Sequence, residues 1–469
     1  MNISVIGTGY VGLVSGACLA EVGHQVTCVD LDPQKVDLIN QKTAPIYEVG
    51  LDALLDRNVG TRLTATQDLR TAVLGSELSL IAVGTPFDGE EIDLSYIKTV
   101  AHQIGDVLRD KEDYHVVVVK STVVPGTTDD VVRPILEEAS GKTAGVDFGV
   151  GMNPEFLREG EAVDDFMNPD RIVLGGIDER TRDVLGEVYA RFEGVDVLRT
   201  GNRTAEMIKY TANSLLATLI SFSNEIGNLC SALGGIDVTE VMEGVHLDKR
   251  LSPILPDGSR IRPAFTTYLE AGCGFGGSCF PKDVKALIAH GRQAGAPMHV
   301  LDAVVQVNQE QPKKVLGLLR RRFSELEGRT VSVLGVAFKP GTDDIRESPA
   351  IPVVQALRAA GAHVTVYDPV AQHEAEKHLG FERIEYVTNL KDAAQDADAL
   401  VLMTRWPVFE TLPTVLEQLD VCPVVVDGRR MLDRGSVRHY EGIGFSPLTS
   451  SRPEESFAYA SVLEVENVY

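Results

Sequence analysis

Apolar residues at the start of the chain follow first the spacing of a strand and then that of a helix. Residues 2–6 form a β-branched run, residues 10–22 carry apolar side chains at helical spacing, and residues 25–29 form a second apolar run. Two further apolar runs, 78–83 and 115–119, each end in a polar loop. Strands that alternate with helices in this way predict a parallel α/β sheet whose ligands lie at its carboxyl edge.

The pattern changes near residue 204, where long helices replace the strands. Residues 205–233 and 283–323 carry apolar positions at helical spacing, and the second stretch is broken near 295–297. After Gly328 strands and helices alternate again, at 330–336, 351–360, 363–367, 399–403 and 424–426. We therefore predict an α/β fold in which two Rossmann-like, doubly wound domains are joined by a long central helix and a helical middle domain. The boundaries that we expect are 1–203, 204–325 and 326–445, followed by a polar, acidic tail at 446–469.

Composition and charge narrow the range of partners. The 469 residues are 44% hydrophobic and 24% charged, as in an ordinary globular protein. Acidic residues outnumber basic ones by 68 to 44, and the net charge of −24 repels phosphate backbones and anionic lipid surfaces. We expect no nucleic-acid partner and no membrane partner, although a local cluster of cations and backbone N–H groups can still bind a small anion.

The six cysteines are scattered through the chain, with no CxxC pair and no Cys/His cluster at zinc-ligand spacing. This pattern predicts neither a disulfide framework nor a metal site. Because the sequence also shows no targeting segment and no apolar run of membrane-spanning length, we expect a reducing, cytoplasmic compartment.

The first predicted strand leads directly into the glycine turn GTGYVG. In such a turn Gly7 permits the tight bend, Gly9 lets a pyrophosphate approach the backbone, and Gly12 lets the helix pack on the strand. Asp30 ends the second strand, where an acid accepts hydrogen bonds from a ribose diol and repels a 2′-phosphate. The motif therefore predicts NAD rather than NADP, with Lys35 near the adenosine.

The two halves of the chain echo each other. Residues 23–30, GHQVTCVD, have a counterpart in residues 361–368, GAHVTVYD. Since the second half lacks the GxGxxG turn, we expect no second dinucleotide there and leave that half free to bind another ligand.

A second glycine-rich segment, residues 274–283, carries a cysteine. Its three glycines predict that the backbone lies close to another group, and Pro281 before a helical run places Cys279 near a helix N-terminus, where a thiolate is stabilised. Lys282 adds positive charge. An arbitrary cysteine is more often a small buried hydrophobe, but the glycines and the Lys-Asp pair favour a nucleophile here.

Two further groups of polar residues are candidates for a functional role. Lys209 and Asn213 lie one helical turn apart, and a cation beside an amide could stabilise an oxyanion. A solvated lysine and an interhelical asparagine are the alternative. Residues 153–160, NPEFLREG, form a loop with two carboxylates for which a charged face is the default interpretation. The ten histidines are spread widely, and we assign none of them a role.

Several motifs, taken in order along the chain, resemble those of the UDP-glucose/GDP-mannose 6-dehydrogenase family. They are GTGYVG at 7–12, KST at 120–122, NPEFLREG at 153–160, the helix with Lys209 and Asn213, GFGGSCFPKD at 274–283, FK at 338–339 with DIRES at 344–348, and VDGRR at 426–430. The resemblance extends from Met1 to about Leu432. It implies two Rossmann-like domains, a homodimer or higher homo-oligomer formed through the helical middle, and oxidation of a nucleotide-sugar C6 alcohol to the carboxylate with two NAD+ and no metal.

The resemblance also implies how this four-electron oxidation proceeds. The first hydride leaves C6 to give an aldehyde, Cys279 adds to form a thiohemiacetal, a second hydride leaves a thioester, and water hydrolyses the thioester. Oxidation without release of the aldehyde demands a covalent anchor, which agrees with the nucleophile predicted from the glycine-rich segment.

Five more residues match the family's catalytic groups. Lys209 and Asn213 would stabilise the oxyanions. Asp283 and Thr122 would position or activate water. Glu155 would take part in acid/base steps, and the sequence leaves open which group is the base.

By the same resemblance, two sets of residues bind the ligands. The cofactor set is Gly7, Gly9, Tyr10, Val11, Gly12, Asp30, Lys35, Thr85, Thr122, Glu159, Lys282 and Arg346. The nucleotide-sugar set is Glu155, Phe156, Leu157, Arg158, Glu159, Lys209, Asn213, Arg250, Tyr268, Leu269, Glu270, Ala271, Gly272, Gly276, Lys339 and Arg429. Tyr268 would supply an aromatic face for the base and Lys339 a point charge for the pyrophosphate. Arg250 resembles an arginine that reaches the site of the neighbouring subunit.

The chain departs from the compact form of the family at residues 252–263, where it carries a longer loop rich in Pro, Gly and Arg. We consider three interpretations of this loop: a subunit contact, an alternative source of phosphate-binding cations, and a plain surface loop.

Several functions are compatible with these motifs. UDP-glucose is the favoured substrate and GDP-mannose the alternative, while an N-acetylhexosamine fits less well because such relatives depart from the GGxCxPKD form. A two-electron hydroxyacid or hydroxyacyl dehydrogenase would release one NADH and would need neither Cys279 nor a third domain. A non-enzymatic NAD-binding module would bind the cofactor without turnover.

Overall fold

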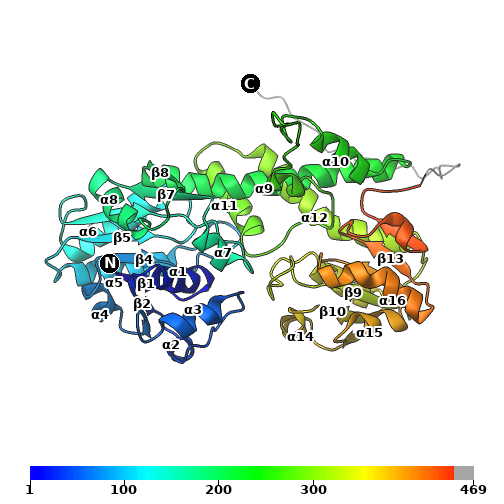
Figure 1. Cartoon of the computed structure of the whole chain (residues 1–469), viewed down its shortest axis with the longest axis horizontal. Coiled ribbons are helices and arrows are strands. Elements are labelled where there is room, and N and C mark those ends of the chain that lie inside the picture. Colours follow the sequence, from blue (N-terminus) through cyan, green and yellow to red (C-terminus); the bar gives the residue numbers. More distant parts are fainter. Residues whose placement is uncertain (448–469) are drawn as a thin grey trace, which may run out of the picture.

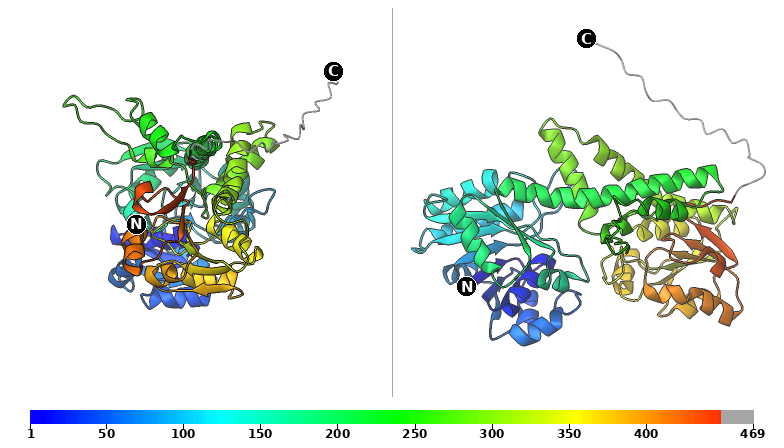
Figure 2. Two further views of the ribbon diagram at one scale, coloured as in Figure 1. Left: turned by 90° about the vertical axis from the view of Figure 1, so that its right-hand side faces the viewer. Right: turned by 45° about the horizontal axis from the view of Figure 1, so that its top comes forward.

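Two α/β domains lie on either side of a helical middle region. The computed structural model describes residues 1–447, so nearly all of the predicted tail, from residue 448 to residue 469, lies outside the described residues. Figure 1 shows the two sheets side by side below one long helix, α9 (Asn202–Leu233). The right-hand view of Figure 2 shows the same helix running from the first domain to the second.

The first domain is built on an eight-stranded sheet in the order β3-β2-β1-β4-β5-β6-β7-β8. All neighbouring strands are parallel except β6 and β7. The strands are β1 (Asn2–Ile6), β2 (Gln25–Val29), β3 (Leu63–Thr66), β4 (Leu78–Ile81), β5 (His115–Val119), β6 (Phe148–Met152), β7 (Arg171–Gly176) and β8 (Asp196–Thr200). Its first six strands have the order 3-2-1-4-5-6 of a dinucleotide-binding fold.

Helices cover both faces of this sheet and divide its core into two apolar clusters. One cluster packs under α1, α2, α3, α7 and α8, and the other under α4, α5 and α6. The helices are α1 (Tyr10–Glu21), α2 (Pro33–Asn40), α3 (Leu51–Asn58), α4 (Leu69–Leu74), α5 (Ser95–Leu108), a π-helix η1 (Thr127–Val132), α6 (Arg133–Ser140), α7 (Ala162–Met167) and α8 (Glu179–Val188). A sheet covered on both faces explains why β4 and β5 are buried at every position rather than alternating between buried and exposed residues.

The middle region packs three shorter helices against α9. Its elements after α9 are α10 (Val238–His246), a 3-10 turn η2 (Ala264–Tyr268), α11 (Phe280–Gln293) and α12 (His299–Arg320). The predicted break near 295–297 is confirmed, because residues 294–298 separate α11 from α12. Within residues 1–447, no helix combines the length and the apolar content that crossing a membrane requires.

The second α/β domain has a six-stranded, fully parallel sheet in the order β11-β10-β9-β12-β13-β14. The strands are β9 (Thr330–Leu334), β10 (His363–Tyr367), β11 (Ile384–Tyr386), β12 (Ala399–Leu402), β13 (Val424–Asp427) and β14 (His439–Gly442). The helices are α13 (Ala350–Ala359), α14 (Gln372–Leu379), α15 (Leu390–Gln395), α16 (Leu412–Leu419) and the 3-10 turns η3 (Pro407–Thr411) and η4 (Arg434–Ser436). Counted from β9, this sheet repeats the strand order of the first six strands of the other one.

Two predicted strands are longer than the observed ones by two residues, and the predicted strand at 399–403 is longer than β12 by one. The apolar run at 78–83 continues two residues beyond β4, and the run at 330–336 continues two residues beyond β9. Val336 is fully buried, but its N–H donates to the Asp368 carboxylate at 2.8 Å instead of to a neighbouring strand. Apolar character therefore reports burial at these positions, whereas the strand ends where its ladder of hydrogen bonds ends.

Candidate active site

The glycine turn lies between β1 and α1 and has the geometry that the sequence predicts. Gly7 has φ +98°, a conformation that favours glycine, and a Cβ atom on Gly12 would lie 1.9 Å from the carbonyl oxygen of Gly7. A Cβ atom on Gly9 would meet no protein atom within 4 Å. Gly9 is also the N-cap of α1 and offers no side chain to the first N–H groups. Open backbone at a helix N-terminus suits a pyrophosphate.

Asp30 follows β2 and braces this turn. Its Oδ2 accepts hydrogen bonds from the Thr8 N–H at 2.8 Å and the Thr8 hydroxyl at 2.6 Å, and its Oδ1 accepts one from the Asp32 N–H at 3.0 Å. Burial raises the pKa of Asp30, but these hydrogen bonds and nearby Lys35 outweigh burial and lower it overall. The residue is therefore an ionised acceptor at the turn, and it also shapes the turn.

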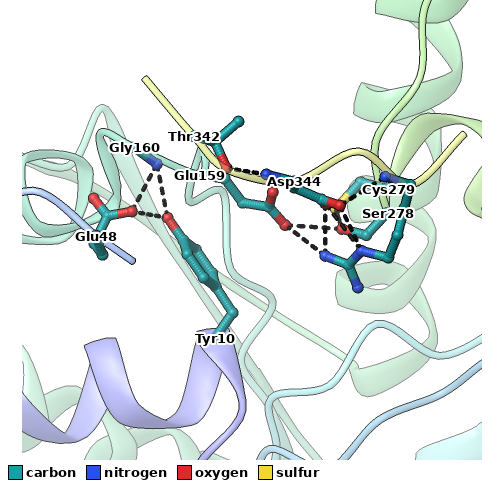
Figure 3. A network of polar contacts seen from close by, with 9 residues as sticks. Tyr10, Glu48, Glu159, Gly160, Ser278, Cys279, Thr342 and Asp344 are labelled. Carbon is teal, nitrogen blue, oxygen red and sulfur yellow. Dashed lines mark hydrogen bonds and ion pairs between the residues drawn. The ribbon is translucent and has the colours of Figure 1, made fainter. Parts of the chain in front are cut away.

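The remaining cofactor candidates lie in the first turn of α1, on loops at the carboxyl edge of the same sheet, or across from that edge. The Thr85 hydroxyl donates to the Thr122 carbonyl oxygen at 2.8 Å, which ties together the loops after β4 and β5. Tyr10 and Val11 are half-buried in the first turn of α1. Tyr10 donates its phenolic hydrogen to Glu48, and the Gly160 N–H donates to Glu48 Oε2 at 2.6 Å. Glu48, which carries no sequence motif, thus fastens the 153–160 loop to α1 (Figure 3).

Cys279 is the N-cap of α11 and lies where the second domain contacts the first. A Cβ atom on Gly276 would lie 2.3 Å from the carbonyl oxygen of Glu347, and the Gly277 N–H donates to the Arg346 carbonyl oxygen at 2.8 Å. The predicted close approach of this glycine-rich backbone to another group is therefore confirmed. The group is the 338–348 loop of the second domain.

The protonation state of Cys279 differs from our expectation. We expected the helix N-terminus and Lys282 to stabilise a thiolate. Burial instead raises the pKa of the Cys279 thiol to about 11, although the Lys209 ammonium lowers it. Lys282 does not assist, because its Nζ pairs with Asp283 Oδ1 at 2.6 Å. The thiolate expectation is thus wrong for the free chain, and the resting sulfur carries a proton.

Lys209 lies on the buried face of α9 and pairs with Glu155 at 2.9 Å, with both side chains about 4% exposed. Burial alone would neutralise both groups, but their attraction keeps the pKa of Glu155 low and that of Lys209 high. The solvated-lysine alternative and the charged-face interpretation of Glu155 are therefore wrong. Asn213 does bridge two helices, since its Nδ2 donates to Asp283 Oδ2 on α11 at 2.6 Å.

The rest of the 153–160 loop is divided between buried and exposed side chains. Phe156 is half-buried under the Arg171 guanidinium, whose carbon is 3.8 Å from the ring centroid, and Leu157 packs against an apolar cluster of the first domain. Arg158 is exposed and pairs with Asp165 at 2.6 Å, as the charged-face interpretation expects.

Glu159 reaches the second domain through a small polar network (Figure 3). Its Oε1 accepts a hydrogen bond from the Ser278 hydroxyl at 3.0 Å and one from Arg346 Nη2 at 3.2 Å. Burial and the neighbouring Asp344 carboxylate raise the pKa of Glu159 to about 7. Next to this network, a Cβ atom on Gly160 would lie 2.1 Å from the carbonyl oxygen of Gly341, so the two domains touch here through bare backbone.

The nucleotide-sugar candidates of the middle region lie between α9, α11 and the second domain. The Tyr268 ring is half-buried, with its centroid 6.3 Å from that of Phe280. Leu269 and Ala271 are buried, and Gly272 donates its N–H to Asn224 Oδ1 at 2.7 Å. Asn224 on α9 therefore fixes the backbone at Gly272.

Charged candidates from the second domain line the same junction. Lys339 is half-buried, and burial lowers the pKa of its ammonium. Arg429 donates to the carbonyl oxygen of Gly274 at 2.9 Å and so links β13 to the glycine-rich segment. Glu270 of the middle region forms an ion pair with Arg405 of the second domain, which occupies the Glu270 carboxylate.

Arg250 lies at the surface of the single chain. Its side chain is 84% exposed and pairs with neighbouring Asp248. In the 252–263 loop, Arg260 Nη1 donates to the carbonyl oxygens of Leu247 and Ser252 at 2.8 and 2.9 Å. Arg260 therefore holds the loop itself together rather than offering a free cation.

Besides Glu48, two buried residues near the site were given no role by the sequence, although Lys120 stands in the KST motif. Lys120 donates to Asn153 Oδ1 at 2.8 Å, and burial lowers its pKa to about 8 even though Glu155 raises it. Glu206 accepts hydrogen bonds from the N–H groups of Gly126 and Thr128 at 2.6 and 2.8 Å and so holds the segment after Thr122. The signal for Glu206 was present, since it lies three residues before Lys209 on one helical face.

Comparison with known proteins gives one consistent result. Residues 1–193 match the UDP-glucose/GDP-mannose dehydrogenase family, NAD binding domain, residues 203–310 match its central domain, and residues 332–434 match its UDP binding domain. The chain is 45% identical over 448 residues to a UDP-glucose 6-dehydrogenase of Haloferax volcanii, with 94% of this chain and 100% of the relative covered. It is 38% identical over 470 residues to a GDP-mannose 6-dehydrogenase of Pseudomonas aeruginosa, with 98% and 100% covered. A solved UDP-glucose dehydrogenase of Pyrobaculum islandicum superposes with a TM-score of 0.86 at 40% identity and covers 95% of this chain and 98% of its own.

Proposed function

The chain belongs to the UDP-glucose/GDP-mannose dehydrogenase family, and we propose that it oxidises UDP-glucose to UDP-glucuronate through Cys279. It is an NAD-dependent oxidoreductase that acts on the C6 alcohol of a nucleotide sugar. The family, the fold class and the NAD dependence expected from the sequence are thereby confirmed. One observation carries the proposed mechanism: the Cys279 sulfur lies within the electrostatic reach of the buried Lys209 ammonium, where the two domains meet.

We propose that Lys209 and Asn213 act on the oxygen of C6. Bound NAD+ accepts a hydride from the sugar in each of the two oxidation steps. Lys209 is held at α9 by Glu155, and an ammonium kept charged by such a partner stabilises negative charge on an alkoxide. Asn213 is oriented by Asp283, which leaves the rest of its amide for the same oxygen. Both groups are fixed before substrate arrives, so little reorganisation is required.

The second half of the reaction needs water beside a thioester. Asp283 is fully buried and accepts hydrogen bonds from Asn213 and Lys282. We propose that Asp283 and Thr122 position this water, and that Glu155 takes part in proton transfer.

For ligand binding, we propose that the first-domain residues of the predicted cofactor set hold NAD+. We propose that Tyr268, Lys339 and the backbone of 269–272 hold the nucleotide.

We also propose that the enzyme is a homodimer or higher homo-oligomer assembled through α9. Leu215, Phe222, Leu229 and Leu233 are each about half exposed, at 57%, 49%, 54% and 56%, and follow one another at helical spacing along one side of α9. A stripe of this kind is typical of a subunit interface. Arg250 would then reach the site of the partner subunit.

Two further expectations stay predictions. They are the domain boundaries, 1–203, 204–325 and 326–445, and the cytoplasmic location.

A substrate panel tests the proposed function. UDP-glucose, GDP-mannose, UDP-galactose and UDP-N-acetylhexosamines are each incubated with NAD+, and NADH and product are measured together. We expect two NADH for each UDP-glucose consumed and a uronate product. Preferential turnover of GDP-mannose would support the alternative that the 38% identical relative suggests. One NADH with an accumulating carbonyl product would instead indicate a two-electron dehydrogenase.

A further inference from the structure

Ser278 lies between the Cys279 sulfur and a carboxylate of the first domain. Its Oγ is 3.6 Å from Cys279 Sγ and 3.0 Å from Glu159 Oε1 (Figure 3). A serine hydroxyl has a single hydrogen, and an ionised carboxylate can only accept. Because that hydrogen is donated to Glu159, the contact between Ser278 and the sulfur has the thiol as donor. The three groups therefore form a directed chain from S–H through O–H to the carboxylate.

The other carboxylates around the sulfur have both oxygens occupied. Glu155 binds Lys209 and the Leu157 N–H, at 2.9 and 2.6 Å. Asp283 binds Lys282 and Asn213. Among residues 1–447, Ser278 is the one side chain hydrogen-bonded to the thiol, and Glu159 Oε2 is a buried oxygen with no hydrogen-bond partner.

We propose that Ser278 and Glu159 form the proton relay that deprotonates Cys279 when it attacks the C6 aldehyde. This inference deepens the proposed function and rests on it. In the step, the sulfur electron pair forms the C–S bond while the thiol proton moves to Ser278 Oγ and the Ser278 proton moves to Glu159. The electron pair of the aldehyde C=O bond moves onto its oxygen, which Lys209 stabilises as an alkoxide. Ser278 is thus a catalytic residue that touches the reacting sulfur, and Glu159 acts through it.

The charges that face Glu159 suit such an acceptor. Asp344 raises the proton affinity of Glu159, and Arg346 lowers it. Lys339 and Tyr10 also lie within electrostatic reach of Glu159. The resulting pKa of about 7 leaves Glu159 largely ionised at slightly alkaline pH, whereas the thiol, with a pKa of about 11, does not ionise by itself. The proton therefore has to leave as the sulfur attacks, which is general-base catalysis.

Alkylation of the free enzyme by iodoacetamide measures this relay without sugar or cofactor. The rate at Cys279 is followed by mass spectrometry of its peptide across pH 5.5–9.5, and exposed Cys422 serves as the internal reference in the same sample. A positioned base contributes about 100-fold or more in rate, so we expect Ser278→Ala and Glu159→Gln each to slow Cys279 alkylation by about that factor at pH 7.5. Ser278→Thr, which keeps the hydroxyl, restores most of the rate.

The pH profile separates a relay from a structural effect. We expect the wild-type rate to rise with an inflection near pH 7 that Glu159→Gln abolishes, while alkylation of Cys422 is unchanged. Equal Cys279 rates and unchanged profiles in Ser278→Ala and Glu159→Gln would overturn the relay. If Ser278→Ala does not fold, Glu159→Gln alone decides. Failure of the substrate panel would reject the proposed function whatever this alkylation shows, so the two failures are distinguishable.

Discussion

The two Rossmann-like domains share a strand order but differ in the loop that follows their first strand. In the first domain β1 leads almost at once into α1, and the turn at Gly9 is open. In the second domain the loop 335–349 separates β9 from α13. A Cβ atom on Gly335 at the start of this loop would lie 2.5 Å from Thr404, so its turn is packed with protein atoms.

The acids that end the second strand of each domain differ in the same way. Asp30 is half-buried and keeps an edge at the surface, whereas Asp368 is 2% exposed. Asp368 accepts hydrogen bonds from Ala337 N–H at 3.0 Å and from the Trp406 indole N–H at 3.1 Å, besides that of Val336. The position of a ribose is thus taken by protein in the second domain.

The long loop of the second domain contributes instead to the site of the first. Gly341 meets Gly160 of the first domain, and the Arg346 carbonyl oxygen accepts the hydrogen bond from Gly277 beside Cys279. One topology is therefore used in two ways: the first domain leaves its glycine turn open, and the second packs its long loop against the segment that carries Cys279. The strand order alone therefore does not determine which ligand a domain can bind. The loop after the first strand makes that difference.

The largest effect that we expect from this comparison is on stability. Asp368→Ala leaves several buried N–H groups without an acceptor, at about 1–3 kcal/mol each, so the free energy of unfolding should fall by about 3 kcal/mol or more. NAD+ affinity should change little. Denaturant unfolding and calorimetric titration measure the two quantities, with exposed Asp396→Ala as the control. A large loss of NAD+ affinity in a folded Asp368→Ala protein would contradict this difference between the domains.

The contact between the domains can be broken at one backbone position. Gly160→Ala would place a Cβ atom 2.1 Å from the Gly341 carbonyl oxygen and push the domains apart, and misplacement of about 1 Å costs about 100-fold in kcat. Gly141→Ala is the matched control, because Gly141 also has a positive φ, +69°, but faces no atom within 4 Å. Similar kcat values for the two variants would show that the contact is not needed for catalysis.

Acid should weaken the first domain through a buried histidine. Burial, assisted by Lys111, lowers the pKa of His115 to about 3, so the folded state excludes the charged form. The unfolded chain binds a proton at His115 below its pKa of about 6.5, whereas the folded chain does not. The free energy of unfolding is therefore highest above this pH and falls as the pH falls, by about 2 kcal/mol between pH 6.5 and 5. We expect His115→Gln to flatten this part of the unfolding curve. An unchanged slope would show that other groups dominate the acid response.

The smallest effect concerns the cofactor turn itself. Asp30→Ala removes an acceptor for the ribose hydroxyls and the brace on Thr8, and we expect NAD+ to bind about tenfold more weakly, the equivalent of about one hydrogen bond to a charged group. Asp37→Ala, an exposed change on α2, is the control for calorimetric titration. Unchanged affinity in Asp30→Ala would mean that another group holds the ribose.

Much of the fold could be read from the sequence, because buried strands and glycine turns leave local signals. The bounds of β1, β2, β5 and β10 agree with their predicted ranges. By contrast, β8 could not be found from hydropathy, since four of its five side chains are exposed at the sheet edge.

Candidate site residues could be named from motifs, but their contacts could not. Cys279, Lys209 and Asn213 stand in motifs, but the link from Ser278 to Glu159 joins residues far apart in the chain and requires the packed loops. The thiolate expectation failed for a related reason. A helix N-terminus is visible in sequence, whereas the burial that outweighs it is set by the whole fold.

The most direct test of covalent oxidation at the domain junction is the product made by Cys279→Ala from UDP-glucose and NAD+, analysed by mass spectrometry together with NAD+ affinity. We expect no detectable uronate and an NAD+ affinity like that of the wild type, because the sulfur is removed while the glycine turn is untouched. Continued accumulation of uronate by this variant would contradict the account.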